Sequence, residues 1–211
     1  MSWLTGPYKP EEGQCSGPFI VVEGVSGVGK STLTRILGEK LNAATLHTLP
    51  EPLSRFASAT NRELRPLPQF AFYLAGALHA SDVIREGGEK GPVVADRYVS
   101  SVIACHAAAH GASIDQVTQL LEPFRPYLVT PDRTFYLRCS EELLRTRMKS
   151  KTDLKADDTE LFDVPGRLPT LLDNFEAVAA ADPTAVVMDT DGRSPDQLAE
   201  NILATLEADR A

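Results

Sequence analysis

The chain of 211 residues is 43% hydrophobic and 24% charged, which is typical of one soluble globular domain. Its formal net charge of -8 argues against general binding to nucleic acid, because such proteins present a basic surface to the phosphates. No apolar run approaches the ~18 residues that a membrane span needs. The sequence therefore predicts a protein that binds neither nucleic acid nor membranes.

The cysteines and the N-terminal segment indicate the compartment and the domain limits. Cys15, Cys105 and Cys139 are widely spaced and form neither a disulfide framework nor a metal-ligand pair, so we expect a reduced, cytoplasmic protein. Residues 1–17 have no basic start followed by an apolar stretch, as a signal peptide would have. We expect a flexible leader over residues 1–17 and a single domain over residues 18–211.

Short apolar runs alternate with helical patterns along this domain. Strands separated by long helices pair in parallel through right-handed crossovers. The sequence therefore predicts an α/β fold of three layers, with a five-stranded parallel sheet and helices on both faces. The strands are expected at Phe19–Glu23, Ala44–Leu49, Pro92–Asp96, Arg133–Cys139 and Ala185–Asp189. Helices are expected after the first strand and at Leu67–Glu86, Val99–His110, Glu141–Lys151 and Pro195–Leu206.

A glycine-rich stretch, GVSGVGKS, follows the first predicted strand and fits the pattern G-x-x-x-x-G-K-[ST]. Glycines let the backbone approach an anion closely, and the N-terminus of the next helix adds partial positive charge. In such a loop Lys30 would reach the β- and γ-phosphates and Ser31 would ligate Mg²⁺. The pattern predicts a site for Mg·ATP made of Gly24, Ser26, Gly27, Val28, Gly29, Lys30, Ser31 and Thr32.

The segments after the second strand carry candidates for binding a phosphate acceptor. Glu51 could orient or deprotonate the acceptor, or it could be a turn residue held between two prolines. Arg55 follows it, and the long helix brings Phe70 and Tyr73, on which a base could stack. At helical spacing these two aromatic residues also fit a core position, so both interpretations stay open.

The third predicted strand ends in Asp96-Arg97-Tyr98, where an open parallel sheet places its ligand groups. Asp96 is a candidate for holding Mg²⁺ or the acceptor, and Arg97 for pairing with phosphate oxygens. Ser101 follows on the next helix as a further acceptor contact. The alternative is an Asp-Arg pair that only caps this helix.

Residues 149–163 are polar, show no clear period and read as a mobile lid. A basic series lies just before and within it. A cation there would stabilise transition-state charge, and Arg147 is the candidate. For any one residue of this basic series, a place on a solvated helix face is the simpler interpretation. The series comprises Arg145, Arg147, Lys149, Lys151 and Lys155.

Three classes of protein carry a phosphate loop of this kind and are candidates for this chain. A switch GTPase would carry Asn-Lys-x-Asp at a strand end, but the nearest match, Ser150–Asp153, follows a predicted helix. A motor ATPase would be a much larger chain. A small-molecule kinase with a lid and an acceptor site opposite the phosphate loop fits best.

With these segments placed, the chain resembles the thymidylate kinase family over residues 19–206. FIVVEGVSGVGKSTL, VVADRYVSS and PDRTFYLRCSEELLRTRM resemble its phosphate loop, its Asp-Arg-Tyr segment with a following serine, and its fourth strand with the pre-lid helix. ELFDVPGR and VVMDTDGRSPDQLAENI resemble its post-lid stretch and last strand. The resemblance implies a homodimeric kinase that uses ATP and Mg²⁺ to phosphorylate a pyrimidine deoxynucleoside monophosphate such as dTMP.

The departures from the family pattern fall on the acceptor side. Ser26 replaces an acidic sugar contact, and Tyr73–Asp82 contains no arginine for the acceptor's phosphate. Cys105-His106 replaces a Tyr-Gln-like pair near the base, Thr170 replaces a tyrosine, and the Glu-Pro-Gly-Gly signature is reduced to Glu-Pro-Leu.

These departures keep other functions open. LPEPLSRF resembles the Glu-Pro segment of deoxynucleoside kinases, in which the glutamate is a base toward a sugar hydroxyl. A (deoxy)nucleoside kinase, or a kinase of a modified nucleoside or nucleotide, is therefore the alternative. An alternative of another class is a non-catalytic ATP-binding regulatory switch.

Overall fold

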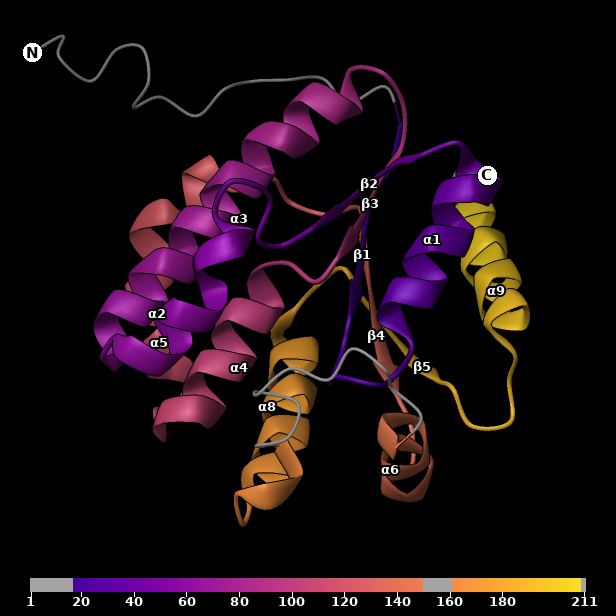
Figure 1. Cartoon of the computed structure of the whole chain (residues 1–211). Helices are drawn as coiled ribbons and strands as arrows, with labels where there is room; N and C mark the ends of the chain where they lie inside the picture. The colour runs from indigo at the N-terminus through magenta and orange to yellow at the C-terminus, as the bar shows by residue number, and fades with distance from the viewer. Residues whose placement is uncertain (1–16, 150–160, 210–211) are drawn as a thin grey trace, which may run out of the picture.

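The computed structural model describes residues 17–149 and 161–209, and Figure 1 shows a central sheet with helices on both sides. Within these residues five parallel strands lie in the order β2-β3-β1-β4-β5. The expected α/β fold is therefore confirmed. The expected leader, most of the expected lid, and Lys151 and Lys155 lie outside the described residues. The strands are β1 Phe19–Glu23, β2 Ala44–His47, β3 Val93–Asp96, β4 Arg133–Arg138 and β5 Ala185–Asp189.

Two layers of helices enclose the sheet. In Figure 1, α1 and α9 lie on one side of the strands, and α3, α4 and α8 lie on the other. Contacts of α1 with α9, and of α4 with both α3 and α8, hold each layer together. The helices are α1 Lys30–Leu41, η1 Ser54–Phe56, α2 Ala57–Glu63, α3 Pro66–Gly88, α4 Val99–His110, α5 Ile114–Leu121, η2 Glu122–Tyr127, α6 Glu141–Lys149, α8 Arg167–Ala181 and α9 Pro195–Ala208.

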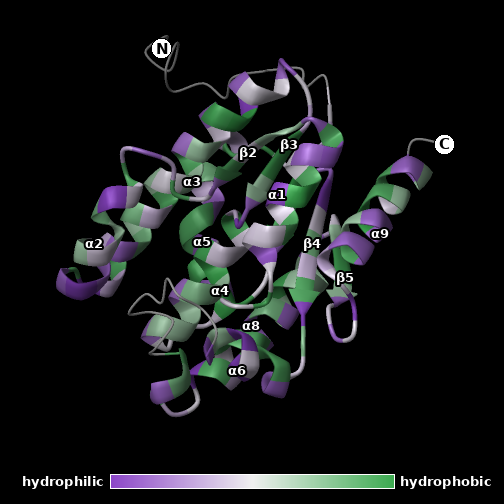
Figure 2. Cartoon of the chain, turned by 45° about the vertical axis from the view of Figure 1, so that its right-hand side comes forward, coloured by the Kyte–Doolittle hydropathy of each residue, from purple (hydrophilic) through white to green (hydrophobic). Residues whose placement is uncertain are grey.

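Alternate residues of the inner strands pack into different layers. Ile20 and Val22 of β1 belong to the larger apolar cluster, whereas Phe19 and Val21 belong to a smaller one that includes Ile84 of α3. All five residues of β1 are buried. Figure 2 shows hydrophobic residues gathered on the strands and on the helix faces turned toward them. A strand covered on both faces reads as a continuous apolar run, which is why β1 was predictable.

The observed elements differ from the predicted ones mainly at their ends. The second strand ends at His47 rather than Leu49, because the chain turns there and the amide of Leu49 donates to Nδ1 of His47 instead of a neighbouring strand. Helix α3 starts at Pro66, a residue favoured in the first turn of a helix. The short elements α2 and α5 were not predicted, and no bounds were predicted for the longer α8. In the part of the chain that the structure describes, no helix has the length and apolarity to cross a bilayer.

Candidate active site

The phosphate loop leaves the carboxyl end of β1 and enters α1. Gly24 has a φ of 134°, and a Cβ there would lie 2.5 Å from the carbonyl oxygen of Leu137, so only glycine fits. Gly29 has a φ of 111° and faces open space. No side chain caps the start of α1 at Gly29. The first amides of this helix therefore remain available to an anion.

Lys30 opens α1 and lies folded over the loop. Its side chain is buried, with the residue 5% exposed, and Nζ donates a hydrogen bond of 2.7 Å to the carbonyl oxygen of Val25. Burial, and next the nearby cation of Arg97, lower the pKa of Lys30 to about 7. An anion bound between these two cations would relieve both effects. The loop thus has the charge pattern of a phosphate site.

Ser31 and Asp96 meet at the point where the phosphate loop faces β3. The hydroxyl of Ser31 donates to Oδ2 of Asp96 at 2.5 Å. The other carboxylate oxygen, Oδ1, is buried and makes no hydrogen bond within the described residues. A groove of about 560 Å³ opens beside both residues and His47. A hydroxyl and a carboxylate with an unused oxygen are ligands that suit Mg²⁺, so the predicted metal pair fits the ion.

Glu23, at the end of β1, is a site residue that sequence reasoning missed. It is fully buried, and its carboxylate accepts hydrogen bonds from the Tyr98 amide at 2.8 Å, the Ser101 amide at 3.1 Å and the Ser101 hydroxyl at 2.6 Å. Burial raises the pKa of Glu23, while the hydrogen bond from Ser101 opposes the shift. The carboxylate ties the start of α4 to β1. An acidic residue that ends an otherwise apolar strand is the signal that could have indicated it.

Arg97 occupies a backbone conformation that non-glycine residues rarely adopt. Its φ is 71°, and its amide donates to the carbonyl oxygen of Val22 at 3.0 Å. The guanidinium donates to the Ser101 hydroxyl at 3.0 Å. Left-handed backbone costs such a residue roughly 1–2 kcal/mol and recurs at functional sites. Arg97 thus places a second cation near enough to Lys30 to lower its pKa.

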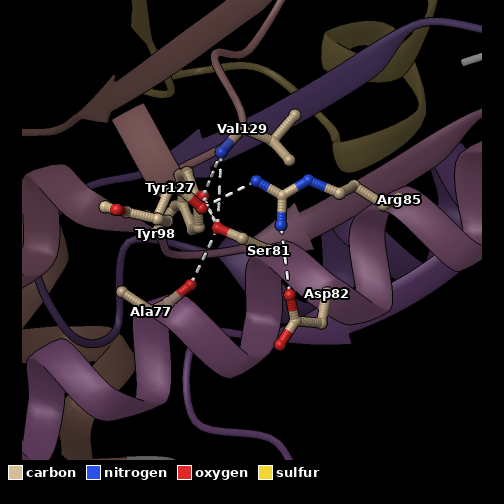
Figure 3. A network of polar contacts seen from close by, with 7 residues as sticks. All are labelled: Ala77, Ser81, Asp82, Arg85, Tyr98, Tyr127 and Val129. Atoms are coloured by element: carbon tan, nitrogen blue, oxygen red, sulfur yellow. Dashed lines mark hydrogen bonds and ion pairs between the residues drawn. The ribbon is translucent and has the colours of Figure 1, made fainter. Parts of the chain in front are cut away.

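A polar network holds the residue after Arg97 (Figure 3). The buried hydroxyl of Tyr98 contacts the hydroxyl of Ser81 on α3, and the Val129 amide donates to Tyr98 at 3.1 Å and to Ser81 at 3.3 Å. Burial raises the pKa of Tyr98 to about 12. Arg85 of α3 adds a hydrogen bond of 2.7 Å to the carbonyl oxygen of Tyr127. The network anchors the Asp96-Arg97-Tyr98 turn to α3 and to the segment before β4.

Arg147 of α6 lies against the phosphate loop. Its Nη1 donates to the carbonyl oxygen of Val28 at 2.8 Å and to the hydroxyl of Thr190 at 3.0 Å. Arg145, in contrast, pairs with Glu141 at 2.7 Å and lies over the ring of Phe162. The described members of the basic series therefore differ, and Arg147 is the one joined to the loop.

Glu51 and Arg55 are brought together by the turn after β2. Arg55 donates through Nε and Nη2 to Oε2 of Glu51 at 3.1 Å, and the hydroxyl of Ser54 donates to Oε1 at 2.5 Å. The Ser54 hydrogen bond, followed by that of Arg55, holds the pKa of Glu51 below its usual value. The Glu51 side chain is 65% exposed. This carboxylate is ionised and a weak base.

The other residues predicted to bind the acceptor already make contacts within the protein. Phe70 is only 3% exposed, as its core interpretation requires. The hydroxyl of Tyr73 donates to Oδ1 of Asn61 at 2.8 Å. Ser101 donates to Glu23 and accepts from Arg97, which leaves its hydroxyl one lone pair.

A parallel sheet that delivers a phosphate loop, two cations and a hydroxyl–carboxylate pair to one edge defines a phosphate-loop kinase. The sequence model of the family described as thymidylate kinase matches residues 22–191. The chain belongs to the thymidylate kinase family.

Known relatives agree with this family and with the fold. The probable thymidylate kinase of Natronomonas pharaonis is 33% identical over 178 residues, which cover 78% of this chain and 85% of the relative. A thymidylate kinase of Synechococcus is 29% identical, with 90% of this chain and 94% of that one covered. The solved thymidylate kinase of Candida albicans has a TM-score of 0.73 at 21% identity, with 92% of each chain covered, and therefore shows the fold alone.

Proposed function

We propose that the chain transfers the γ-phosphoryl group of Mg·ATP to a pyrimidine deoxynucleoside monophosphate, with dTMP as the leading acceptor. The observation that carries the proposal is a phosphate loop on which the buried Lys30 lies beside the Ser31–Asp96 pair, with Arg97 following Asp96 at the end of β3. Phosphoryl transfer requires mainly positioning and neutralisation of phosphate charge, which these groups supply.

On the donor side, the residues Gly24 to Thr32 cradle the phosphates of ATP, and Lys30 moves from Val25 to the β- and γ-phosphates. Ser31 and Asp96 would hold Mg²⁺, and the ion would supply positive charge that neutralises the phosphates. Arg147 positions the loop through its bond to Val28.

On the acceptor side, Arg97 binds phosphate oxygens of the acceptor or of the transferred group. Glu51 and Arg55 orient the acceptor from the turn after β2. The Glu51 carboxylate, held by Ser54 and Arg55, is ionised and offers the acceptor a positioned hydrogen-bond acceptor or base. Phe70, Tyr73 and Ser101 support the same side from α3 and α4.

A deoxynucleoside kinase is the second candidate. Helix α3 has no lysine or arginine from Pro66 to Ile84 with which to bind an acceptor's phosphate. At Gly76, a Cβ would lie 2.4 Å from Cδ1 of Leu49, so the Leu49 side chain would have to move to admit a larger residue here. These observations favour an acceptor that carries less charge.

ADP release with a panel of deoxynucleosides and their monophosphates tests the proposal. We expect stimulation by dTMP above that by thymidine. Greater stimulation by thymidine would favour the nucleoside kinase. If the chain binds ATP but no acceptor stimulates ADP release, the non-catalytic regulatory switch becomes the favoured function. Light scattering of the purified chain tests the homodimer that the family resemblance implies.

A further inference from the structure

Helix α6 covers two successive residues of the phosphate loop. A Cβ at Gly27 would lie 2.5 Å from Sδ of Met148 and 3.3 Å from Cδ1 of Leu144, so the helix packs closely on the loop at this glycine. The next residue of the loop, Val28, accepts a hydrogen bond of 2.8 Å from Arg147 through its carbonyl oxygen. The shape of the loop therefore depends on the position of α6.

The turn that follows β5 binds the start of this helix. Ser140 directly precedes α6, and its amide donates to both carboxylate oxygens of Asp191, at 3.0 Å to Oδ1 and 3.2 Å to Oδ2. Hydrogen bonds from the Ser140 side chain, and next from its amide, hold the pKa of Asp191 below its usual value. The carboxylate is therefore ionised near pH 7, and a negative charge next to the N-terminus of a helix is stabilising.

The same turn also binds the last turn of α6. The hydroxyl of Thr190 accepts from Nη1 of Arg147 at 3.0 Å, and this nitrogen is the one that donates to Val28. The Thr190 amide donates to the carbonyl oxygen of Arg138 in β4 at 2.9 Å, so the sheet fixes the place of this hydroxyl. Thr190 is 1% exposed, which keeps its side chain from direct contact with a nucleotide. It acts on a bound phosphate through Arg147.

We propose that Thr190 and Asp191 are positioning residues, which hold α6 against the phosphate loop and so raise the affinity of the loop for the triphosphate of Mg·ATP. The inference rests on the proposed function, because it takes this loop as the site of the ATP phosphates. Thr190 fixes the guanidinium of Arg147 beside Val28, and Asp191 fixes the start of the helix that carries it. A loop already held in its binding conformation loses less entropy when an anion binds. Because neither residue acts on the base, inorganic triphosphate should report their effect as well as a nucleotide does.

Calorimetry of triphosphate binding, without an acceptor, tests this inference. Thr190→Val keeps the shape of the side chain and removes its hydroxyl. Because the lost bond has a charged donor, the Kd values for Mg·triphosphate and for the non-hydrolysable analogue β,γ-imido-ATP should rise by the same factor, roughly 5- to 10-fold. An unchanged affinity for triphosphate overturns the inference. A loss confined to the analogue also overturns it, since that result would place Thr190 at the base.

Thr146→Val is the matched control for this substitution. Thr146 lies on α6 itself, and its hydroxyl donates to the carbonyl oxygen of Glu142 in the same helix at 2.9 Å. The control should leave both Kd values unchanged. Equal losses in Thr146→Val and Thr190→Val would show a general disturbance of α6 and would contradict the role of Thr190.

A double-mutant cycle shows whether Thr190 acts through Arg147. Arg147→Met keeps much of the length of the side chain and removes the guanidinium. In that background Thr190→Val should change the Kd for triphosphate by less than about 2-fold, because the bond that it removes is already lost. Full additivity of the two losses would mean that Thr190 has only a structural role, which contradicts the inference.

Two substitutions of Asp191 test the contact at the start of α6. Asp191→Ala should raise the Kd for triphosphate by roughly 3- to 10-fold, whereas Asp191→Asn, which keeps an oxygen for the Ser140 amide, should recover most of the affinity. Equal losses in the two variants contradict the role assigned to this hydrogen bond.

These measurements separate the inference from the proposed function. Binding that responds as expected, without phosphoryl transfer to any acceptor, would refute the proposed function alone. A wild-type chain that binds neither triphosphate nor the analogue would refute both.

Discussion

The donor and acceptor halves of the site differ in how their polar groups are held. Around the phosphate loop, Lys30, Asp96 and Glu23 are buried. Asp96 and Glu23 are also bonded to segments 65 and 75 residues away in the sequence. On the acceptor side, Glu51 and Arg55 bind each other on an exposed turn. The comparison indicates that the donor half is preorganised, whereas the exposed turn with Glu51 and Arg55 can change its contacts when the acceptor binds. Changes in the donor half should therefore reduce turnover, and changes in the acceptor half should alter selectivity.

The largest expected effect comes from Lys30→Ala. Removing a preorganised charge that faces the transferred group costs about 3 kcal/mol or more, so kcat should fall by at least 10²-fold with every acceptor. Acceptor-dependent ADP release measures it, and circular dichroism checks the fold. A Lys30→Ala protein with wild-type turnover would remove this residue from the donor half.

Asp96→Asn should lower kcat more than 10-fold while changing ATP affinity less, because the carboxylate acts on the metal and the transferred phosphate. The concentration of Mg²⁺ at half-maximal rate should rise as well. Asp82→Asn is the matched control, since Asp82 is an exposed carboxylate on α3 that pairs with Arg85. Equal kinetics of the two variants would mean that Asp96 is only structural.

Tyr98→Phe tests the network behind Arg97. The Val129 amide and the Ser81 hydroxyl lose a buried partner, so the free energy of unfolding should fall by about 1–2 kcal/mol in urea titrations. Tyr127→Phe is the control, because Arg85 binds the backbone carbonyl oxygen of Tyr127, which this substitution keeps. If both variants are equally stable, the network does not support the site.

The smallest expected effect is a proton taken up with the nucleotide. The pKa of Lys30 is lowered to about 7 in the free chain, so most molecules carry a neutral amine there at pH 8. Bound phosphates favour the ammonium form, and binding at pH 8 should therefore take up most of one proton. Calorimetry in buffers of different ionisation enthalpy measures the uptake, which should vanish below pH 6. Equal uptake by Lys30→Ala would assign the proton to another group.

How much the sequence could predict depended on how local each signal is. The phosphate loop and the bounds of β1, α4 and β5 follow from residues adjacent in the chain, and they agree with the structure. The role of Glu23 depends on Tyr98 and Ser101, which lie 75 and 78 residues away. The contact of Arg147 with Val28 spans 119 residues. Such pairings arise only when the sheet aligns its carboxyl ends, so single-sequence patterns could suggest candidates for a site but not their partners.

The acceptor residues show the same limit. Phe70 fitted both a core position and a stacking position at helical spacing, and its burial favours the core. Glu51 was a candidate base, but a base requires a pKa that only the folded environment sets. Ser54 and Arg55, which hold this carboxylate and lower its pKa, are partners that the sequence alone did not indicate.

Phosphorus NMR of the product tests the central claim most directly. The wild-type chain with Mg·ATP and an equal mixture of dTMP and thymidine should produce the resonances of a diphosphate, dTDP, alongside ADP. Production of dTMP from thymidine without dTDP would contradict the assignment of a monophosphate acceptor to this site.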